Sequence, residues 1–487
     1  MTINHKILLT ALVCINLQIA SLFAQDNTMY MLHQLPQANI LNPAVDFPCD
    51  FYIELPLLSS AKLAYNNSSF TYKDILRQGT GDQQDSLVLD FDNIYPHLRK
   101  NNYINLEVEN VILGAGFHWK EYFISARIYH RLQSSVQYTK DLIGLKDGNW
   151  NPVTDSPINY QLAGNELNEI SYWGISAAIS RDFTSSLRLG ARLSYLKGSS
   201  NFQTKNSELE ISTTEQPVAV NIHTDYEVNA SFPMEYQRDA NGRIYSMQPV
   251  FDNFVKDFIF NSNRGVSIDF GAVYQYNDKI KLAVSVLNLG FIRWASNSVN
   301  LRTEGDINYI GVDLDQYALP NQNTDLIQIL RDTISSSFHF YDSPTKYLTL
   351  LPARIFAGGT YQLSPITELA LTGNISIING ATIPTITGSV NLKPNDFLNL
   401  SGSISYANRT IRNIGLAFIL GNPSFNFYFV SDMLPINYVQ ETQSGLIFPY
   451  NSRSFNFRFG INLLFGCGNS KSGNSSRSGG KVCPAYR

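Results

Sequence analysis

The sequence predicts an all-β protein, a transmembrane antiparallel β-barrel of about 14 strands (roughly 12–16), with short helices in its loop insertions. Three observations predict this class. Apolar and polar residues alternate over segments of about 9–12 residues, the length of a tilted membrane strand. The polar face of these segments is made of Gly, Ser, Asn and Arg rather than the Lys and Glu typical of a solvated sheet. Past residue 24, the chain contains no apolar run long enough for a transmembrane helix.

Composition limits the classes of function. Only 16% of the 487 residues are charged, against about 25% in ordinary soluble domains. The net charge of −4 lacks the basic excess that a nucleic-acid partner requires, so none is expected. The 12% aromatic content argues against disorder over most of the chain.

The first residues have the pattern of an export signal. Lys6 precedes an apolar stretch that runs to about Ile19, and the small residue Ala24 ends the segment. This pattern predicts a signal peptide over residues 1–24. A membrane-anchor helix is the alternative, but polar residues interrupt the stretch and it is short for a span. Residues 25–48 then form an N-terminal periplasmic or plug segment.

The alternation is clearest in the segment Ser454–Phe465. Its six odd-numbered positions, from Phe455 to Phe465, are all apolar, whereas its even-numbered positions contain one apolar residue, Leu464. Successive side chains of a strand point to opposite faces, so one face is apolar and the other polar. The same pattern recurs in the segments 122–130, 187–195, 267–276 and 398–406.

The positions of the arginines favour a membrane barrel over a soluble β-sandwich, which also alternates. An arginine on the lipid face at mid-membrane costs about 2–4 kcal/mol. The arginines of the alternating strands fall on the polar face, which we therefore interpret as the lumen. Aromatic residues near the strand ends match the girdles of a membrane barrel. The lumen-facing candidates are Arg127, Arg188, Arg192, Asp269 and Arg458.

The barrel is expected to occupy residues 49–466. A Gly/Ser-rich tail without periodicity follows over residues 467–487, and its composition predicts disorder. Two pieces of the polar insertions have a helical pattern, 252–260 and 324–335. We interpret them as parts of connecting loops, with a lid or a lumen plug as the alternative. The longer insertions lie near 77–100, 139–168, 231–263 and 304–348.

Several segments, taken in their order along the chain, resemble a known family. They are Leu35–Ala44, Cys49–Pro56, Gly265–Tyr274, Val286–Trp294 and Phe459–Gly466. Together they resemble the Bacteroidota outer-membrane family catalogued as domain of unknown function 5723, related in style to PorP/SprF and FadL-like barrels. The resemblance covers about residues 25–466. It implies an outer-membrane barrel without assigned chemistry, and it brings no catalytic residues.

No catalytic, metal or cofactor site is indicated. The seven histidines are scattered, without ligand spacing or a cysteine partner. No G-x-S-x-G motif occurs, so we expect a non-enzymatic protein. The cysteines past the signal peptide are Cys49, Cys467 and Cys483, and an oxidising periplasm permits a disulfide. Cys467 with Cys483 closes the shortest loop and is the expected pair, with Cys49–Cys467 as the alternative.

Three functions remain open. The first is a channel for small or hydrophobic solutes in the bacterial outer membrane, surrounded by outer-membrane lipid. The second is an accessory barrel of a secretion or gliding machine, with Asn42-Pro43-Ala44 and the tail docking a periplasmic or secretion-machine protein. The third and most remote is an outer-membrane hydrolase. A polar lumen suits a channel and an accessory barrel equally, so the sequence does not choose between these two.

Overall fold

The computed structural model describes residues 26–467, with gaps at 57, 79–86, 152, 216–217, 241, 243, 310–340, 379–380, 408–409, 435–437, 441–446 and 450–451. These residues form a closed antiparallel barrel of 14 strands, which confirms the predicted fold class. The predicted signal peptide (1–24), the predicted tail beyond residue 467 and the helical piece 324–335 lie outside the described residues.

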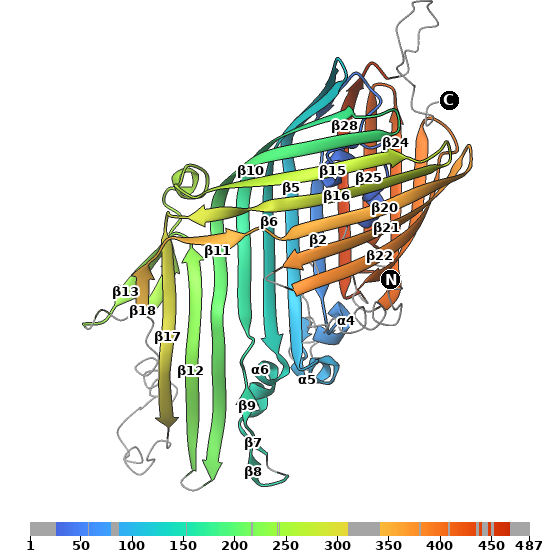
Figure 1. The fold of residues 1–487 in the computed structure, drawn as a ribbon. Helices are drawn as coiled ribbons and strands as arrows, with labels where there is room; N and C mark the ends of the chain where they lie inside the picture. Colours follow the sequence, from blue (N-terminus) through green and yellow to red (C-terminus); the bar gives the residue numbers. More distant parts are fainter. Residues whose placement is uncertain are drawn as a thin grey trace, which may run out of the picture.

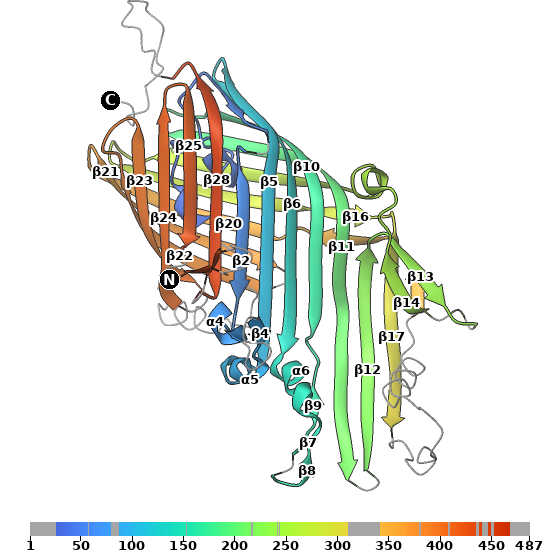
Figure 2. The same ribbon diagram turned by 180° about the vertical axis from the view of Figure 1, so that it is seen from behind.

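The barrel wall follows chain order from strand to strand (Figure 1, Figure 2). β1 and β2 together form the first wall strand, because each pairs with β5 on one side and with β28 on the other. This pairing of the first and last strands closes the sheet and leaves no edge exposed. The wall strands are β1 (Phe51–Glu54), β2 (Ala61–Asn67), β5 (Asn101–Trp119), β6 (Tyr122–Thr139), β10 (Glu166–Asp182), β11 (Leu187–Glu215), β15 (Arg264–Gln275), β16 (Ile280–Trp294), β20 (Ala353–Ser364), β21 (Thr367–Ile378), β22 (Ala381–Leu392), β23 (Leu398–Ala407), β24 (Thr410–Asn422), β25 (Phe425–Met433) and β28 (Ser454–Phe465).

The two ends of the barrel differ. At one end, called the short-turn end, brief turns join β5 to β6, β10 to β11 and β15 to β16. The other, long-loop end carries the insertions and an extension of the wall by β12 (Val218–Ser231), β17 (Ser298–Tyr309), β18 (Tyr341–Pro344) and β19 (Tyr347–Leu350). Figure 1 shows β11, β12 and β17 reaching well past the rest of the barrel at this end.

Small elements fill the insertions. The short strands are β3 (Leu76–Gln78), β4 (Leu87–Leu89), β7 (Trp150–Asn151), β8 (Ser156–Pro157), β9 (Tyr160–Gln161), β13 (Met234–Arg238), β14 (Ile244–Pro249), β26 (Tyr438–Gln440) and β27 (Ile447–Pro449). The helical turns are α2 (Asn27–Tyr30), α3 (Ala38–Leu41), α4 (Tyr72–Ile75), α5 (Phe91–Ile94), η2 (Tyr95–His97), α6 (Lys140–Gly144), η3 (Leu145–Asp147) and η4 (Val255–Ile259). In the part of the chain that is described, no helix has the length and apolarity to cross a membrane.

β11 differs from expectation. It is much longer than the alternating segment 187–195 of the sequence, because β11 runs through 29 residues without a break. Its first half pairs with β15 and its second half with β12. The polar stretch between them stays extended because β10 continues to pair with it as far as Gln203. Backbone hydrogen bonding depends on the neighbouring strand and not on side-chain polarity.

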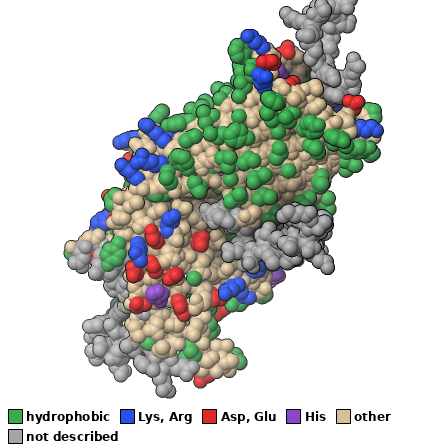
Figure 3. Space-filling view, viewed as in Figure 1, with side chains coloured by type: hydrophobic (Ala, Val, Ile, Leu, Met, Phe, Trp, Pro, Cys, Tyr) green, Lys and Arg blue, Asp and Glu red, His purple; other side chains and the backbone are tan. Residues whose placement is uncertain are grey.

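The outer wall is apolar over the barrel proper. Outward side chains such as Leu193, Phe270 and Ile404 are about half exposed. Figure 3 shows these hydrophobic side chains spread over the barrel, whereas acidic side chains gather on the extension. In the same strands, inner-face polar side chains such as Arg192, Ser267 and Ser403 are buried, as the alternation predicts.

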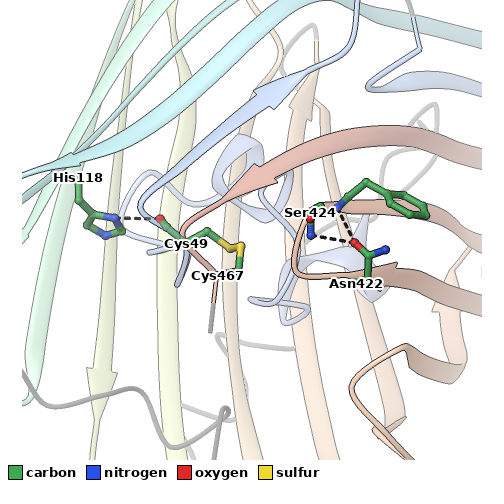
Figure 4. The surroundings of a disulfide bond; sticks show 6 residues. Cys49, His118, Asn422, Ser424 and Cys467 are labelled. Atoms are coloured by element: carbon green, nitrogen blue, oxygen red, sulfur yellow. Dashed lines mark hydrogen bonds between the residues drawn. A yellow bond between two sulfur atoms is a disulfide. The ribbon is translucent and has the colours of Figure 1, made fainter. Parts of the chain in front are cut away.

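One disulfide joins the two ends of the barrel sequence, and it corrects the expected pairing. Cys467 is bonded to Cys49, the alternative partner, and not to the expected Cys483, which lies outside the described residues (Figure 4). Because Phe51 pairs with Phe465, barrel closure brings the two cysteines together across 418 positions of sequence. Barrel closure, and not the length of the loop in sequence, brings the bonded cysteines together.

Candidate functional site

Residues 26–48 lie inside the barrel and form what we call the plug (Figure 1, dark blue). Its two helical turns, α2 and α3, are each four residues long, and most plug side chains are buried. At the short-turn end, the plug leads into β1 through the disulfide-bonded Cys49. Apolar packing contributes near the middle, where the Tyr30 ring stacks on Phe356 with centroids 4.9 Å apart.

Asp26 is the centre of a charged network across the lumen. Its carboxylate lies 2.9 Å from Lys62 Nζ, 2.9 Å from Arg354 Nη1 and 3.5 Å from Arg458 Nη2. Lys62 and Arg458 come from the neighbouring strands β2 and β28, and Arg354 comes from β20 on the far side of the wall. Asp26 therefore ties the start of the plug to distant parts of the barrel.

Two glutamates of β5 balance the remaining positive charge. Glu107 pairs with Lys62 at 2.9 Å, and Glu109 pairs with Arg458 at 2.9 Å and also with Arg131. All these side chains are nearly fully buried. Removing such ions from water costs several kcal/mol each unless they are paired. The network is therefore stable only while its members stay together.

A second set of contacts holds the middle of the plug. Arg127 Nε donates to both carboxylate oxygens of Glu54, at 2.9 and 3.1 Å, and its guanidinium also reaches the carbonyl of Pro36. Gln37 Nε2 donates to Asn462 at 2.6 Å. On the α2 side, Thr28 Oγ1 lies 2.8 Å from Ser403 Oγ. These contacts join the plug to the wall through polar groups.

Arg192 of β11 and Asp269 of β15 anchor α3 to the wall. Arg192 Nη1 donates to Asp269 Oδ2 at 2.9 Å and to the carbonyl of Ile40 at 2.9 Å. Its Nη2 donates to the carbonyl of Asn39. The carbonyls lie near the end of the one-turn helix α3, where no backbone N–H of the helix reaches them. The guanidinium of Arg192 gives these buried carbonyls their hydrogen-bond donors.

The plug comes closest to the wall at Asn42-Pro43. Asn42 Nδ2 donates to the backbone carbonyls of Ala272 and Val284, at 3.2 and 3.3 Å. Gly190 and Gly271 face each other in register at this place. A Cβ at Gly190 would collide with the backbone of Pro43, and one at Gly271 with the Asn42 side chain. Both glycines are therefore required by close approach of the plug.

The charged side chains leave little open space at this height. They enclose a cavity of about 30 Å³, which has room for only a few water molecules. Its lining includes Asp26, Glu109, Arg127, Arg192 and Asp269. The plug and the network therefore close the passage here.

The structure brings four of the five predicted lumen residues to one cavity beside the plug. Arg127, Arg192, Asp269 and Arg458 all line the same cavity. Arg188 lies nearer the short-turn end, where it pairs with Asp46 at 3.3 Å and with Asp182 at 3.1 Å.

Sequence reasoning missed most of the carboxylates and several cations. The missed residues are Asp26, Glu54, Lys62, Glu107, Glu109, Arg131 and Arg354. A signal existed for two of them, because Glu107 and Glu109 are two residues apart in an expected strand and so share a face. The Asn42-Pro43-Ala44 segment, which would dock a partner under the accessory-barrel hypothesis, is buried in the lumen. No group of metal-binding side chains occurs in the described part of the chain.

Comparison with known proteins gives a family but no curated relative. A family model described as "Family of unknown function (DUF5723)" matches residues 43–432, in agreement with the resemblance seen in the sequence. No curated protein matches the chain.

Several solved structures align with most of this chain at low identity. The Ralstonia pickettii toluene transporter TbuX is 9% identical over 88% of this chain and 94% of its own, with a TM-score of 0.40. A Pseudomonas aeruginosa FadL homologue is 10% identical over 88% and 94%, with a TM-score of 0.36. The Pseudomonas putida toluene transporter TodX is 9% identical over 88% and 92%, also with a TM-score of 0.36. Likeness at this level does not define a function.

Proposed function

Because the chain belongs to DUF5723, a family of unknown function, we propose its function from the geometry of the barrel and the plug. We propose that it is a gated channel of the bacterial outer membrane for small or hydrophobic solutes. The gate is the plug, which closes the passage at the Asp26 network and opens it by moving away from the wall.

The observation that carries this proposal is how the plug is held. It crosses the lumen as a separate segment and contacts the wall largely through side chains, such as those of Asp26, Arg127 and Arg192. Such contacts can break and re-form without disturbing the wall ladder. Polar networks also weaken steeply when water enters, because water competes for each hydrogen bond. A plug of this kind is suited to displacement.

A hollow in the wall beside the plug supports the hydrophobic solute class. It has a volume of about 530 Å³ and spans β10, β11, β15 and β16. The hollow is lined by the outward apolar side chains Ile179, Leu189 and Phe270. Gly190 and Gly271, whose inner faces contact Asn42-Pro43, also line it. Pockets of this size and apolar character suit small organic molecules.

Two features support the outer-membrane location. Brief turns at one end and long insertions at the other are typical of bacterial outer-membrane barrels. The apolar outer wall would face lipid. Protein extracted from the outer-membrane fraction is expected to migrate anomalously on a denaturing gel when unboiled and to shift on boiling. A soluble periplasmic protein without this shift would contradict the location.

The gate is tested by locking it. Thr28→Cys with Ser403→Cys places two thiols where the hydroxyl oxygens are 2.8 Å apart. In planar bilayers, the wild-type protein is expected to show ion current, the oxidised double variant none, and the reduced double variant current again. Wild-type protein treated with the same reductant is the control. If neither the wild type nor the reduced variant carries ion current, although the gel shift on boiling shows that both are folded, the protein is not a channel.

The wall extension favours one other role, that of an accessory barrel of a secretion or gliding machine. β11, β12 and β17 stand past the barrel as an antiparallel sheet with many exposed polar side chains. Arg238 of β13 binds both carboxylate oxygens of Asp342 of β18, at 2.6 and 2.8 Å, which braces the hairpin β13–β14 against the sheet. Two results together would favour this role. The protein would carry no ion current in planar bilayers, and another protein would co-purify with it but be lost when the extension is shortened.

A further inference from the structure

A row of basic side chains crosses the outer wall near the long-loop end. Arg264 of β15 and Arg293 of β16 are directly opposite each other in register. The pairing of Leu196 with Gly265 places Lys197 of β11 beside Arg264 on the other side. Each of these residues has a buried neighbour in its own strand, namely Leu196, Gly265 and Ile292. Because successive side chains of a strand point to opposite faces, the three basic side chains point outward. We call Lys197, Arg264 and Arg293 the basic row.

The basic row marks the edge of the apolar wall. Along the same strands, the next outward residues toward the short-turn end are Tyr195, Val266 and Phe291, which are 39–49% exposed. From Val266, outward apolar residues continue as far as Tyr274, about the length of one tilted membrane strand. Figure 3 shows basic side chains gathered at this edge of the hydrophobic surface. The row therefore lies where the boundary between lipid tails and lipid headgroups would be.

An aromatic neighbour independently indicates the headgroup level. Trp173 of β10 pairs in register with Lys197, and on its other side with His130 of β6, whose ring lies 4.8 Å from the indole. Tryptophan is enriched at the interface between lipid and water. The row and the aromatic pair therefore lie at the same depth.

The charges of the row lack a protein counterion. Like charges directly opposite each other destabilise a sheet. No ion pair between described residues includes Lys197, Arg264 or Arg293. Among the described residues, Lys197 Nζ donates to the carbonyl of Asn261. An anion from outside the protein would relieve this repulsion.

The η4 segment forms one wall of the site. Ser199 Oγ donates to the carbonyl of Phe258 at 2.9 Å, and Asn261 Nδ2 donates to the carbonyl of Gly198 at 2.6 Å, so η4 lies on β11 beside Lys197. Phe254 and Phe260 are 57% and 74% exposed there. Exposed aromatic side chains beside the row would contact a lipid at the boundary between its headgroup and its acyl chains.

We infer that the basic row binds the phosphate groups of an anionic outer-leaflet lipid, whose tails lie over Tyr195, Val266 and Phe291. Guanidinium groups bind phosphate through paired hydrogen bonds, so two adjacent arginines suit a phosphorylated headgroup. The apolar side chains below the row would hold the tails, which a free phosphate ion lacks. This site lies on the outer wall and is independent of the plug and of transport.

The test compares lipid binding by two double variants. The first is Arg264→Gln with Arg293→Gln. The matched control is Arg181→Gln with Lys279→Gln, which removes two exposed basic residues at the short-turn end of the same wall. Full-length protein in phosphatidylcholine nanodiscs is titrated with lipid A that carries two phosphates, with the same lipid after phosphate removal, and with inorganic phosphate. The gel shift on boiling checks that each variant is folded.

The wild type and the control are expected to bind only the phosphorylated lipid. The first variant should bind it about thirty-fold more weakly, the effect of losing two charges at an anionic headgroup. If this variant does not fold, the single Arg293→Gln variant should show about five-fold weakening. The inference is wrong if the arginine variants bind the phosphorylated lipid as tightly as the wild type, or if the control loses as much affinity as they do. It is also wrong if the dephosphorylated lipid binds equally well, or if inorganic phosphate binds as tightly as the lipid.

Discussion

The carboxylate of Asp26 and the Nζ of Lys62 form a 2.9 Å ion pair inside the barrel, between the first residue of the plug and the first wall strand. Both side chains are almost completely removed from solvent. Arg354 and Arg458 share the same carboxylate. This arrangement ties the first residue of the plug to three cations of the wall through one acidic group.

Replacing Asp26 by Asn should loosen the plug. The change removes the carboxylate charge that Lys62, Arg354 and Arg458 share. Removing one partner of a buried ion pair typically costs about 3–5 kcal/mol. We expect higher ion current in planar bilayers and a lower free energy of unfolding in denaturant titrations.

The matched control is Asp92→Asn, which removes an exposed partner of Lys146. Exposed pairs contribute little because water screens them. If both variants behave like the wild type, the Asp26 network does not hold the plug.

Replacing Gly190 by Val should push the plug off the wall. The added side chain would occupy the space of the Pro43 backbone. Overpacking of this kind costs about 1–3 kcal/mol, and movement of the plug would relieve it. Current should rise relative to the wild type. Gly402→Val is the control, since a Cβ at Gly402 meets no atom within 4 Å. Equal currents from the two variants would mean that the plug does not respond to this contact.

Arg458 and Arg188 should differ in their contribution to stability, although the alternation places both on the lumen face. Arg458→Gln leaves buried Glu109 and Asp26 short of a partner, and we expect a loss of about 3–5 kcal/mol. Arg188→Gln removes pairs with the partly exposed Asp46 and Asp182, and we expect about 0–1 kcal/mol. Denaturant titrations of both variants in the same detergent measure the difference.

The disulfide is tested by a peptide map without reduction. A peptide containing Cys49 should be linked to one containing Cys467, and Cys483 should carry the free thiol. Cys49→Ser should lower the free energy of unfolding by about 2–5 kcal/mol, since the bond closes a loop of most of the chain. A linked Cys467–Cys483 peptide would show that barrel closure does not select the pair.

The architecture could be predicted from the sequence because it depends on local periodicity. In Ser454–Phe465, a period of two residues separates an apolar from a polar face, whatever the neighbouring strands are. The same period placed Arg127, Arg192 and Arg458 on the inner face, where the structure has them. It failed to show that β11 is continuous, because its polar middle pairs with β10.

The candidate site could be predicted only in part. Alternation assigns a residue to a face, but it does not state which inner-face residues meet. Asp26 lies in no strand, so its burial among Lys62, Arg354 and Arg458 had no periodic signal. Their distances in sequence are 36, 328 and 432 residues.

By itself, the sequence determined the strands, their two faces and the class of fold, because these follow from side-chain polarity repeated at the strand period. Only the tertiary structure decided that residues 26–48 enter the lumen, that Asp26 joins three distant cations, and that Cys49 pairs with Cys467. The physical reason is that these contacts depend on closure of the barrel and on strand register. Closure brings together residues that no local pattern relates.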